Sequence, residues 1–175
     1  MAKVNDASCN VECVERTEEL RYLILGAQRE GARAFAELLR KARLTPAQAE
    51  VLSLLREAER SLTVREIGDL LVCEGGSPSR LVASLVDAGL LQRGSREGDR
   101  RAVELSLTQR GRAAAKKVRR AEAGLHDWLA TALDDRDVPA AIRTLRTIVE
   151  GRPAGNAIAR RTGTTTERES RPPVR

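Results

Sequence analysis

The sequence predicts a mainly α-helical fold with one small β-hairpin. Before residue 151, apolar residues recur every three or four positions over most of the chain, as in amphipathic helices. Two Thr-x-x-Gln/Glu sequences, beginning at Thr45 and Thr63, have the form of helix-starting capping boxes. Alternation of apolar and polar residues over 102–107 is instead typical of a strand. A chain of 175 residues, 41% hydrophobic and 32% charged, fits one globular domain.

Three helices are expected in the first half of the chain. The first is long and amphipathic and covers about 14–42. Thr45 caps the second helix, at about 46–57. Thr63 caps a short third helix near 64–72.

A fourth helix and a hairpin follow. Two glycines in the sequence at 73–76 favour a tight turn, after which Ser77 caps a helix that ends at Gly89. Segments 90–95 and 101–108 are expected to be strands that flank a charged, glycine-containing tip. The inward face of the second strand would carry Val103, Leu105 and Leu107.

The last part of the chain predicts two more helices and a tail. Thr108 caps the first of these helices. Its apolar residues form a seam that requires a partner helix: Val118, Ala121, Leu125, Trp128 and Ala132. A final helix is expected near 138–150, and 151–175 is predicted to be a disordered basic tail.

Two short helices joined by a glycine-bearing turn and followed by a hairpin form a winged helix-turn-helix, an arrangement that binds duplex DNA. The second helix of the pair would read the major groove, because hydroxyl and guanidinium groups suit base edges and phosphates. Its candidate contacts are Ser77, Ser79, Arg80 and Ser84. The hairpin would be the wing, since arginines on a thin loop can enter the minor groove. The wing candidates are Arg96, Asp99, Arg100 and Arg101.

The charge of the chain agrees with this interpretation. A net charge of +6 and a pI of about 9.9 favour an acidic partner, nucleic acid first. The aromatic residues number only three: Tyr22, Phe35 and Trp128. This scarcity argues against single-stranded RNA, which is bound by stacking on several aromatic side chains. Double-stranded DNA is therefore the expected partner.

These motifs resemble the MarR family of transcriptional regulators over about 14–150 of this sequence. The resemblance is carried by LTPAQAEVLSLL, TVREIGDLL and SPSRLVASLVDAGLLQR, and by a wing pattern made of Asp99, Arg101, Leu107, Thr108 and Gly111. It implies a homodimer whose first and last two helices interleave. The dimerisation region would then be 14–42 with 108–150, and the DNA-binding region 43–107.

The resemblance also implies roles for the wing residues. Asp99 would brace a wing arginine, and Arg101 would reach the minor groove, with Arg96 and Arg100 as neighbouring candidates. The predicted function is a homodimeric regulator of transcription that binds a near-palindromic duplex site. Repression relieved by a small effector is the expected form. A non-specific architectural DNA-binding protein is an alternative.

Two sets of residues suggest how DNA binding would be controlled. Tyr22 and Trp128 are candidates to line an effector pocket, because the family often binds aromatic or phenolic ligands; seam packing is the alternative for Trp128. Cys9 and Cys13 lie in an N-terminal arm, 1–13, and Cys73 lies before the fourth helix. These thiols suggest a redox, metal or iron–sulfur sensor, with unreactive free thiols as the alternative.

Other classes of protein are not supported. No set of Cys, His and acidic residues suggests a catalytic centre, so an enzyme is not expected. The sequence also lacks a long apolar run and a secretory leader, so neither membrane insertion nor export is expected. The predicted location is the cytoplasm, with reduced cysteines.

Overall fold

The computed structural model describes residues 6–73, 77–96 and 99–163, and of 6–13 and 95–102 only the backbone. It confirms a mainly helical fold with a small antiparallel sheet. The helices are α1 (Asp6–Leu39), the short 3-10 helix η1 (Arg40–Ala42), α2 (Pro46–Ala58), α3 (Val64–Leu70), α4 (Pro78–Asp87), α5 (Gln109–Ala132), α6 (Val138–Val149) and α7 (Pro153–Thr162). The strands are β1 (Leu62–Thr63), β2 (Leu91–Arg96) and β3 (Asp99–Leu107).

The sheet has the order β1-β3-β2. Leu62 of β1 pairs with Leu105 of β3, and Leu91 of β2 pairs with Leu107. Leu105 is fully buried, as the alternating pattern predicts, whereas Val103 is 48% exposed. The alternation therefore identifies the strand, but its outer half extends beyond the core.

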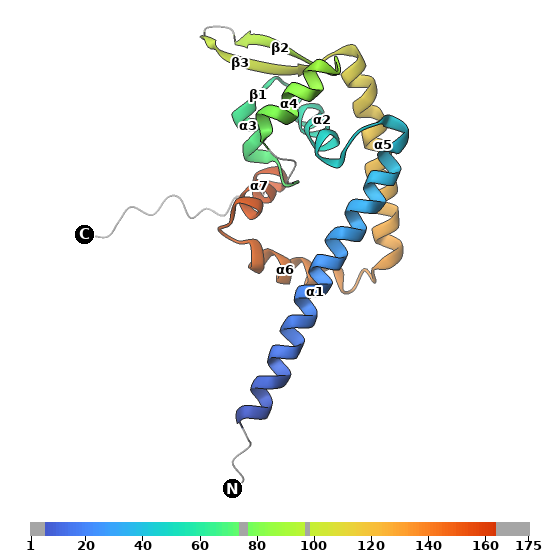
Figure 1. Ribbon diagram of the computed structural model, residues 1–175, viewed down its shortest axis with the longest axis vertical. Coiled ribbons are helices and arrows are strands. Elements are labelled where there is room, and N and C mark those ends of the chain that lie inside the picture. Colours follow the sequence, from blue (N-terminus) through green and yellow to red (C-terminus); the bar gives the residue numbers. More distant parts are fainter. Residues whose placement is uncertain (1–5, 74–76, 97–98, 164–175) are drawn as a thin grey trace, which may run out of the picture.

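The core lies between the sheet and the helices that surround α2. The middle of helix α2 is buried on all sides, since each of residues 49–55 is buried. Leu85 of α4, Val118 of α5 and Leu39 of α1 complete the same cluster. Figure 1 shows this compact region at one end of the molecule, with α1 and α5 leading away from it.

Two boundaries differ from those predicted. Helix α1 begins at Asp6, so Cys9 and Cys13 belong to its first turns rather than to a separate arm. Residues 153–162 form α7, so the prediction that the chain is disordered from 151 onward is wrong for them. Ala157 in α7 is 3% exposed, and tertiary packing of this kind stabilises helices whose own periodicity is weak.

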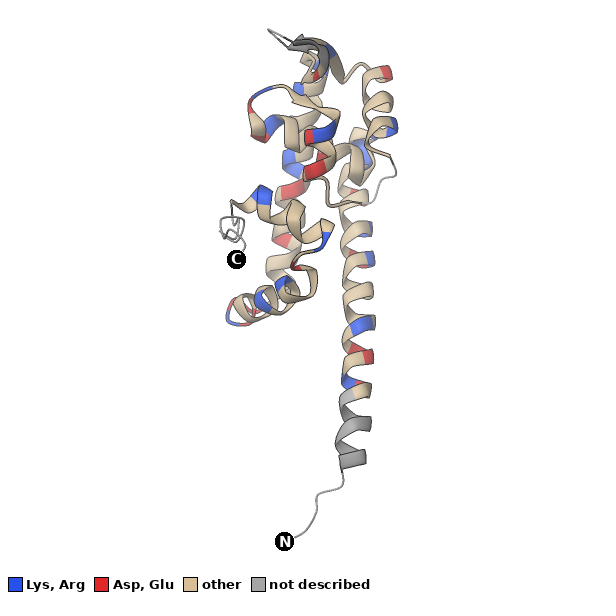
Figure 2. Ribbon diagram, turned by 90° about the vertical axis from the view of Figure 1, so that its left-hand side faces the viewer, with Lys and Arg blue, Asp and Glu red and all other residues tan. Residues whose placement is uncertain are grey.

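Helix α1 packs against α5 and α2 at its C-terminal end, and its other end projects away from the rest of the chain, as both ribbon views show (Figures 1 and 2). Figure 2 also shows residues of both charges along this helix. Its exposed apolar residues include Leu20, Leu23 and Leu25. Within the described ranges, no helix is both long enough and apolar enough to cross a membrane.

Candidate nucleic-acid interface

Helix α3 begins with the capping box that the sequence predicts. The Glu66 N–H donates to the Thr63 hydroxyl at 3.2 Å, and the Thr63 N–H donates to the Glu66 carboxylate at 2.7 Å. Arg60 forms an ion pair with the same carboxylate at 2.8 Å. The backbone hydrogen bond from Thr63 and the contact with Arg60 lower the pKa of Glu66 to about 2. These contacts fix the start of α3 and the end of β1 together.

Helix α4 presents one buried and one exposed face. Leu81, Val82 and Leu85 pack into the core, while Ser79 and Arg80 are exposed near the start of the helix. Pro78 occupies the first helical position, where the absence of an N–H costs nothing. An exposed start of a helix, held by an apolar back face, is suited to contact a groove of duplex DNA.

The two remaining serines of this helix have different surroundings. Ser77 stands at the N-cap position as predicted, but its side chain makes no capping hydrogen bond. Ser84 donates its hydroxyl to the Leu81 carbonyl at 2.8 Å and accepts from the Gln48 amide at 3.2 Å. Ser84 therefore joins α4 to α2, and its predicted DNA contact would compete with that role.

Strands β2 and β3 form the predicted hairpin. Ser95 pairs with Val103 and Arg96 with Asp99, with an irregularity in the register between Ser95 and Arg96. The side chains of Arg96, Asp99, Arg100 and Arg101 lie outside the described residues. The backbone therefore places these residues at the far end of the hairpin, and their individual roles stay predictions.

A glycine contact fixes the hairpin against α5. A Cβ added to Gly111 would lie 2.0 Å from the Leu90 carbonyl oxygen, so no larger residue fits there. The Thr108 hydroxyl accepts from the Gly111 N–H at 3.0 Å and donates to the Gly89 carbonyl at 2.8 Å. Gly89 has a φ of +67°, which favours glycine. The Thr108–Gly111 pattern thus joins the end of α4, the hairpin and α5.

Comparison with known proteins agrees with this geometry. The MarR family profile matches residues 44–102, which span α2 to the middle of β3. Crystal structures of MarR from E. coli are similar over most of the fold. The apo wild type is 27% identical with a TM-score of 0.59, and covers 74% of this chain and 96% of its own. A mutant MarR complexed with operator DNA is 26% identical with a TM-score of 0.66, and covers 75% and 94%.

The chain is therefore similar to the MarR family in sequence over residues 44–102, and in fold to solved MarR structures over 74–75% of its length. This family consists of DNA-binding transcriptional regulators rather than enzymes. A curated relative is the organic hydroperoxide resistance transcriptional regulator of Bacillus subtilis (strain 168), 33% identical over 93 residues. That match covers 53% of this chain and 63% of the relative, so it spans less than two thirds of the relative's length.

Sequence reasoning missed one polar residue next to this MarR-type helix pair. Glu50 of α2, only 8% exposed, accepts hydrogen bonds from the N–H groups of Val72 and Cys73, both at 2.9 Å. The same carboxylate forms an ion pair with Arg161 of α7, at 2.6 Å. These four residues come from three parts of the chain, and no local spacing in the sequence connects them.

Cys73 is the one cysteine whose side chain lies among the described residues, and it is a free thiol. The pKa of the Cys73 thiol is raised to about 11 by its partial burial and by the Glu50 carboxylate. A raised pKa keeps a thiol protonated and slow to react. The side chains of Cys9 and Cys13 lie outside the described residues, and no metal-binding group of three His, Cys, Asp or Glu side chains occurs among those inside.

Tyr22 and Trp128 lie on exposed surfaces, at 60% and 40% exposure. The guanidinium of Arg21 stacks over the Tyr22 ring, 4.2 Å from its centroid.

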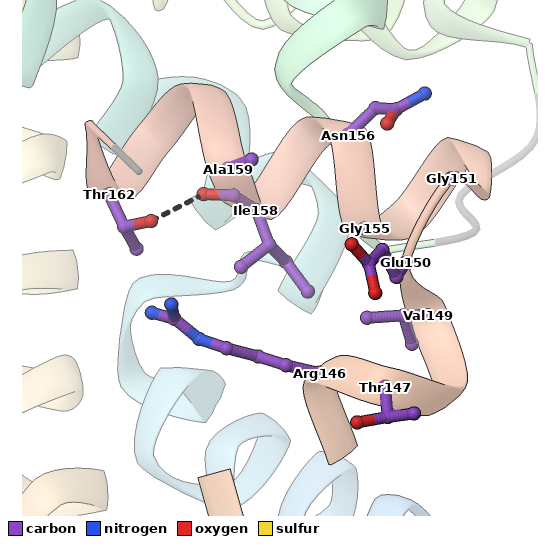
Figure 3. A pocket seen from close by; sticks show the side chains of 10 residues that line it. All are labelled: Arg146, Thr147, Val149, Glu150, Gly151, Gly155, Asn156, Ile158, Ala159 and Thr162. Atoms are coloured by element: carbon purple, nitrogen blue, oxygen red, sulfur yellow. Dashed lines mark hydrogen bonds between the residues drawn. The ribbon is translucent and has the colours of Figure 1, made fainter. Parts of the chain in front are cut away.

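A cavity of about 270 Å³ lies elsewhere, between α6 and α7 (Figure 3). Arg146 extends along this cavity opposite Ile158. Neither of the two predicted pocket residues lines it.

Proposed function

We propose that this chain is a homodimeric transcriptional regulator that binds a specific duplex DNA site through α4 and the β2–β3 hairpin. One observation carries the proposal: Ser79 and Arg80 are exposed on α4, whose opposite face is locked into the core. The similarity to MarR from E. coli, which has been crystallised with operator DNA, supports it. The protein would act in the cytoplasm, as a repressor that an effector releases from DNA.

Unpartnered apolar surface supports a dimer. Leu20 and Leu23 on α1 are exposed, and α6 has no buried residue in the single chain. The large exposed apolar residues at the end of α5 and on α6 are Trp128, Leu129, Leu133, Ile142, Leu145 and Ile148. Apolar surface on this scale marks an interface. A two-fold dimer would present two α4 helices to successive major grooves, about 34–36 Å apart, on a near-palindromic site.

The test is DNA binding by the wild type and two charge-matched variants. The probe is the duplex that the wild-type protein selects from a random library, measured by fluorescence anisotropy. Arg80→Ala should weaken binding by about 10- to 100-fold, because an arginine at a groove contributes about 1–3 kcal/mol. Arg136→Ala removes the same charge from the turn between α5 and α6, at the opposite end of α5 from the sheet, and should change binding less than twofold.

Three outcomes would contradict parts of the proposal. Equal binding by Arg80→Ala and the wild type would remove α4 from the interface. Unchanged binding by Arg101→Ala would remove the assignment of the wing arginine. Displacement by random duplex as readily as by the selected one would favour a non-specific architectural protein instead.

A thiol-based response is the second candidate function. It is supported by the relative from B. subtilis, whose name refers to organic hydroperoxide resistance. Cys9 and Cys13 lie four residues apart within α1 and would share one face of it. The raised pKa of Cys73 argues against the third thiol as the sensor.

The second candidate is tested by oxidation of the bound complex. An organic hydroperoxide should release the wild type from its selected duplex but leave a Cys9→Ser, Cys13→Ser double variant bound. Release of both proteins, or of neither, would contradict a sensor built from this pair. An aromatic effector near Tyr22 and Trp128 remains the first candidate for control, since it needs no reactive thiol.

A further inference from the structure

One buried carboxylate connects three separate parts of this chain. The Glu50 side chain is 7% exposed and accepts from the N–H groups of Val72 and Cys73, which lie between α3 and α4. Arg161, 27% exposed, donates to the same carboxylate at 2.6 Å. Removing Arg161 would leave the Glu50 carboxylate buried without a positive partner. An unpaired buried carboxylate destabilises the fold, so this arrangement depends on Arg161.

Helix α7 has few other attachments. Ala157 is buried, while Arg160 makes an exposed contact with the Asp69 carbonyl at 3.2 Å. Figure 1 shows α7 lying beside α3, at the end of a turn from α6. A Cβ added to Gly155 would lie 2.0 Å from the Val149 carbonyl oxygen, so the α6–α7 turn is also closely fitted. Arg161 is therefore the main polar link between α7 and α2.

The amides that Glu50 holds belong to the segment that leads from α3 into α4. Glu50 and both amides lie within the family match, residues 44–102, whereas Arg161 lies outside it. We infer that Arg161 is a positioning residue for DNA binding: by pairing with Glu50 it fixes the entry to α4 and hence the direction in which Ser79 and Arg80 point. This inference rests on the proposed function.

A general loss of positive charge would also weaken DNA binding, and a matched variant separates the two effects. Arg160 is adjacent to Arg161 in the same helix and carries the same charge, but its side chain is 53% exposed and it does not contact Glu50. Electrostatic attraction to phosphates would fall equally in Arg160→Ala and Arg161→Ala. Only Arg161→Ala removes the partner of the buried carboxylate.

The experiment combines two measurements on the full chain. The first is affinity for the selected duplex and for a random duplex. The second is hydrogen exchange of the Val72 and Cys73 amides by NMR in the absence of DNA. Arg161→Ala should bind the selected duplex about tenfold more weakly, bind the random duplex within twofold of the wild type, and exchange both amides at least tenfold faster. Arg160→Ala should match the wild type, and Arg161→Lys should restore most of the affinity.

Gly155→Ala provides a second route if Arg161→Ala fails to fold, because it displaces α7 without removing any charge. It should reproduce both effects. The inference is overturned if Arg161→Ala and Arg160→Ala give the same affinity and exchange, or if selected-site affinity falls while the two amides stay protected. If the wild type binds no duplex DNA, the proposed function fails, and the exchange data alone decide whether α7 holds the entry to α4.

Discussion

At the scale of single residues, Gly111 allows another part of the backbone to approach α5 closely. Gly111 lies in the first turn of α5. A Cβ at this position would lie only 2.0 Å from the Leu90 carbonyl oxygen. The neighbouring Thr108 hydroxyl uses both its donor and its acceptor capacity within the same junction. The sequence pattern marks both positions, but only the structure shows that glycine is required by the approach of another backbone.

We therefore expect Gly111→Ala to destabilise the protein by more than about 2 kcal/mol, the range of strongly overpacked sites. Gly94→Ala is the matched control, since a Cβ at Gly94 meets nothing within 4 Å. Urea denaturation would measure both variants. A loss below about 0.5 kcal/mol for Gly111→Ala would show that the hairpin and α5 are not held as described.

The Glu66 carboxylate gives a prediction for pH dependence. Its pKa is lowered to about 2 from an ordinary value of 4.5, so its contribution to stability is present above pH 4.5 and is lost as the pH falls toward 2. The side chain is 36% exposed, and solvent screening therefore reduces the contribution to about 1 kcal/mol. Glu66→Gln should lower the free energy of unfolding by that amount at pH 7. The two proteins should converge near pH 2, and a difference that persists there would contradict the ionic origin.

At the scale of elements, local signals predicted the helices that begin with a capping threonine. The hydrogen bonds of Thr45, Thr63 and Thr108 involve residues only three positions away, so the sequence contains both partners. The sequence did not predict α7, because this helix is held by contacts between residues far apart in the sequence. Arg161 and Glu50, for example, are 111 positions apart. Two usable signals were present, Pro153 at the helix start and Gly163 at its end, where φ is +67°.

The contact between α2 and α5 is also polar and distant in sequence. Ser53, which is fully buried, donates its hydroxyl to Glu122, and Arg56 contacts the other oxygen of that carboxylate at 3.1 Å. Glu122→Ala should destabilise the protein by about 1–3 kcal/mol, because it leaves the buried hydroxyl without its acceptor. Glu57→Ala removes an exposed contact to the same arginine and should cost less than about 0.5 kcal/mol. Thermal unfolding would distinguish them, and equal losses would argue against the buried network.

At the scale of the whole molecule, the family and the helix-turn-helix with its hairpin were accessible from sequence, because both follow from local patterns. The sequence motif also predicts minor-groove contacts for Arg96, Arg100 and Arg101. These contacts remain predictions. The dimer is inferred from surfaces that the single chain leaves exposed. Apolar seams in the sequence indicate that a partner helix is needed, but they do not distinguish a helix of the same chain from one of a second copy.

The proposed dimer gives a prediction about assembly. Leu145→Glu on α6 should convert the protein to a monomer, since it places a charge in the apolar surface that a second copy would cover. Arg143→Glu introduces the same residue about 200° away around the helix and should leave the dimer intact. Sedimentation velocity would measure both. A dimeric Leu145→Glu variant would exclude this face of α6 from the interface.

In the proposed complex, two copies of this chain hold two α4 helices against one duplex. Sedimentation of the wild-type protein with a fluorescently labelled selected duplex, in the presence of excess random duplex, tests it most directly. We expect a complex of two chains per duplex that survives at least a 1,000-fold excess of competitor. A single chain per duplex, or a complex that the competitor removes completely at equal concentration, would contradict it.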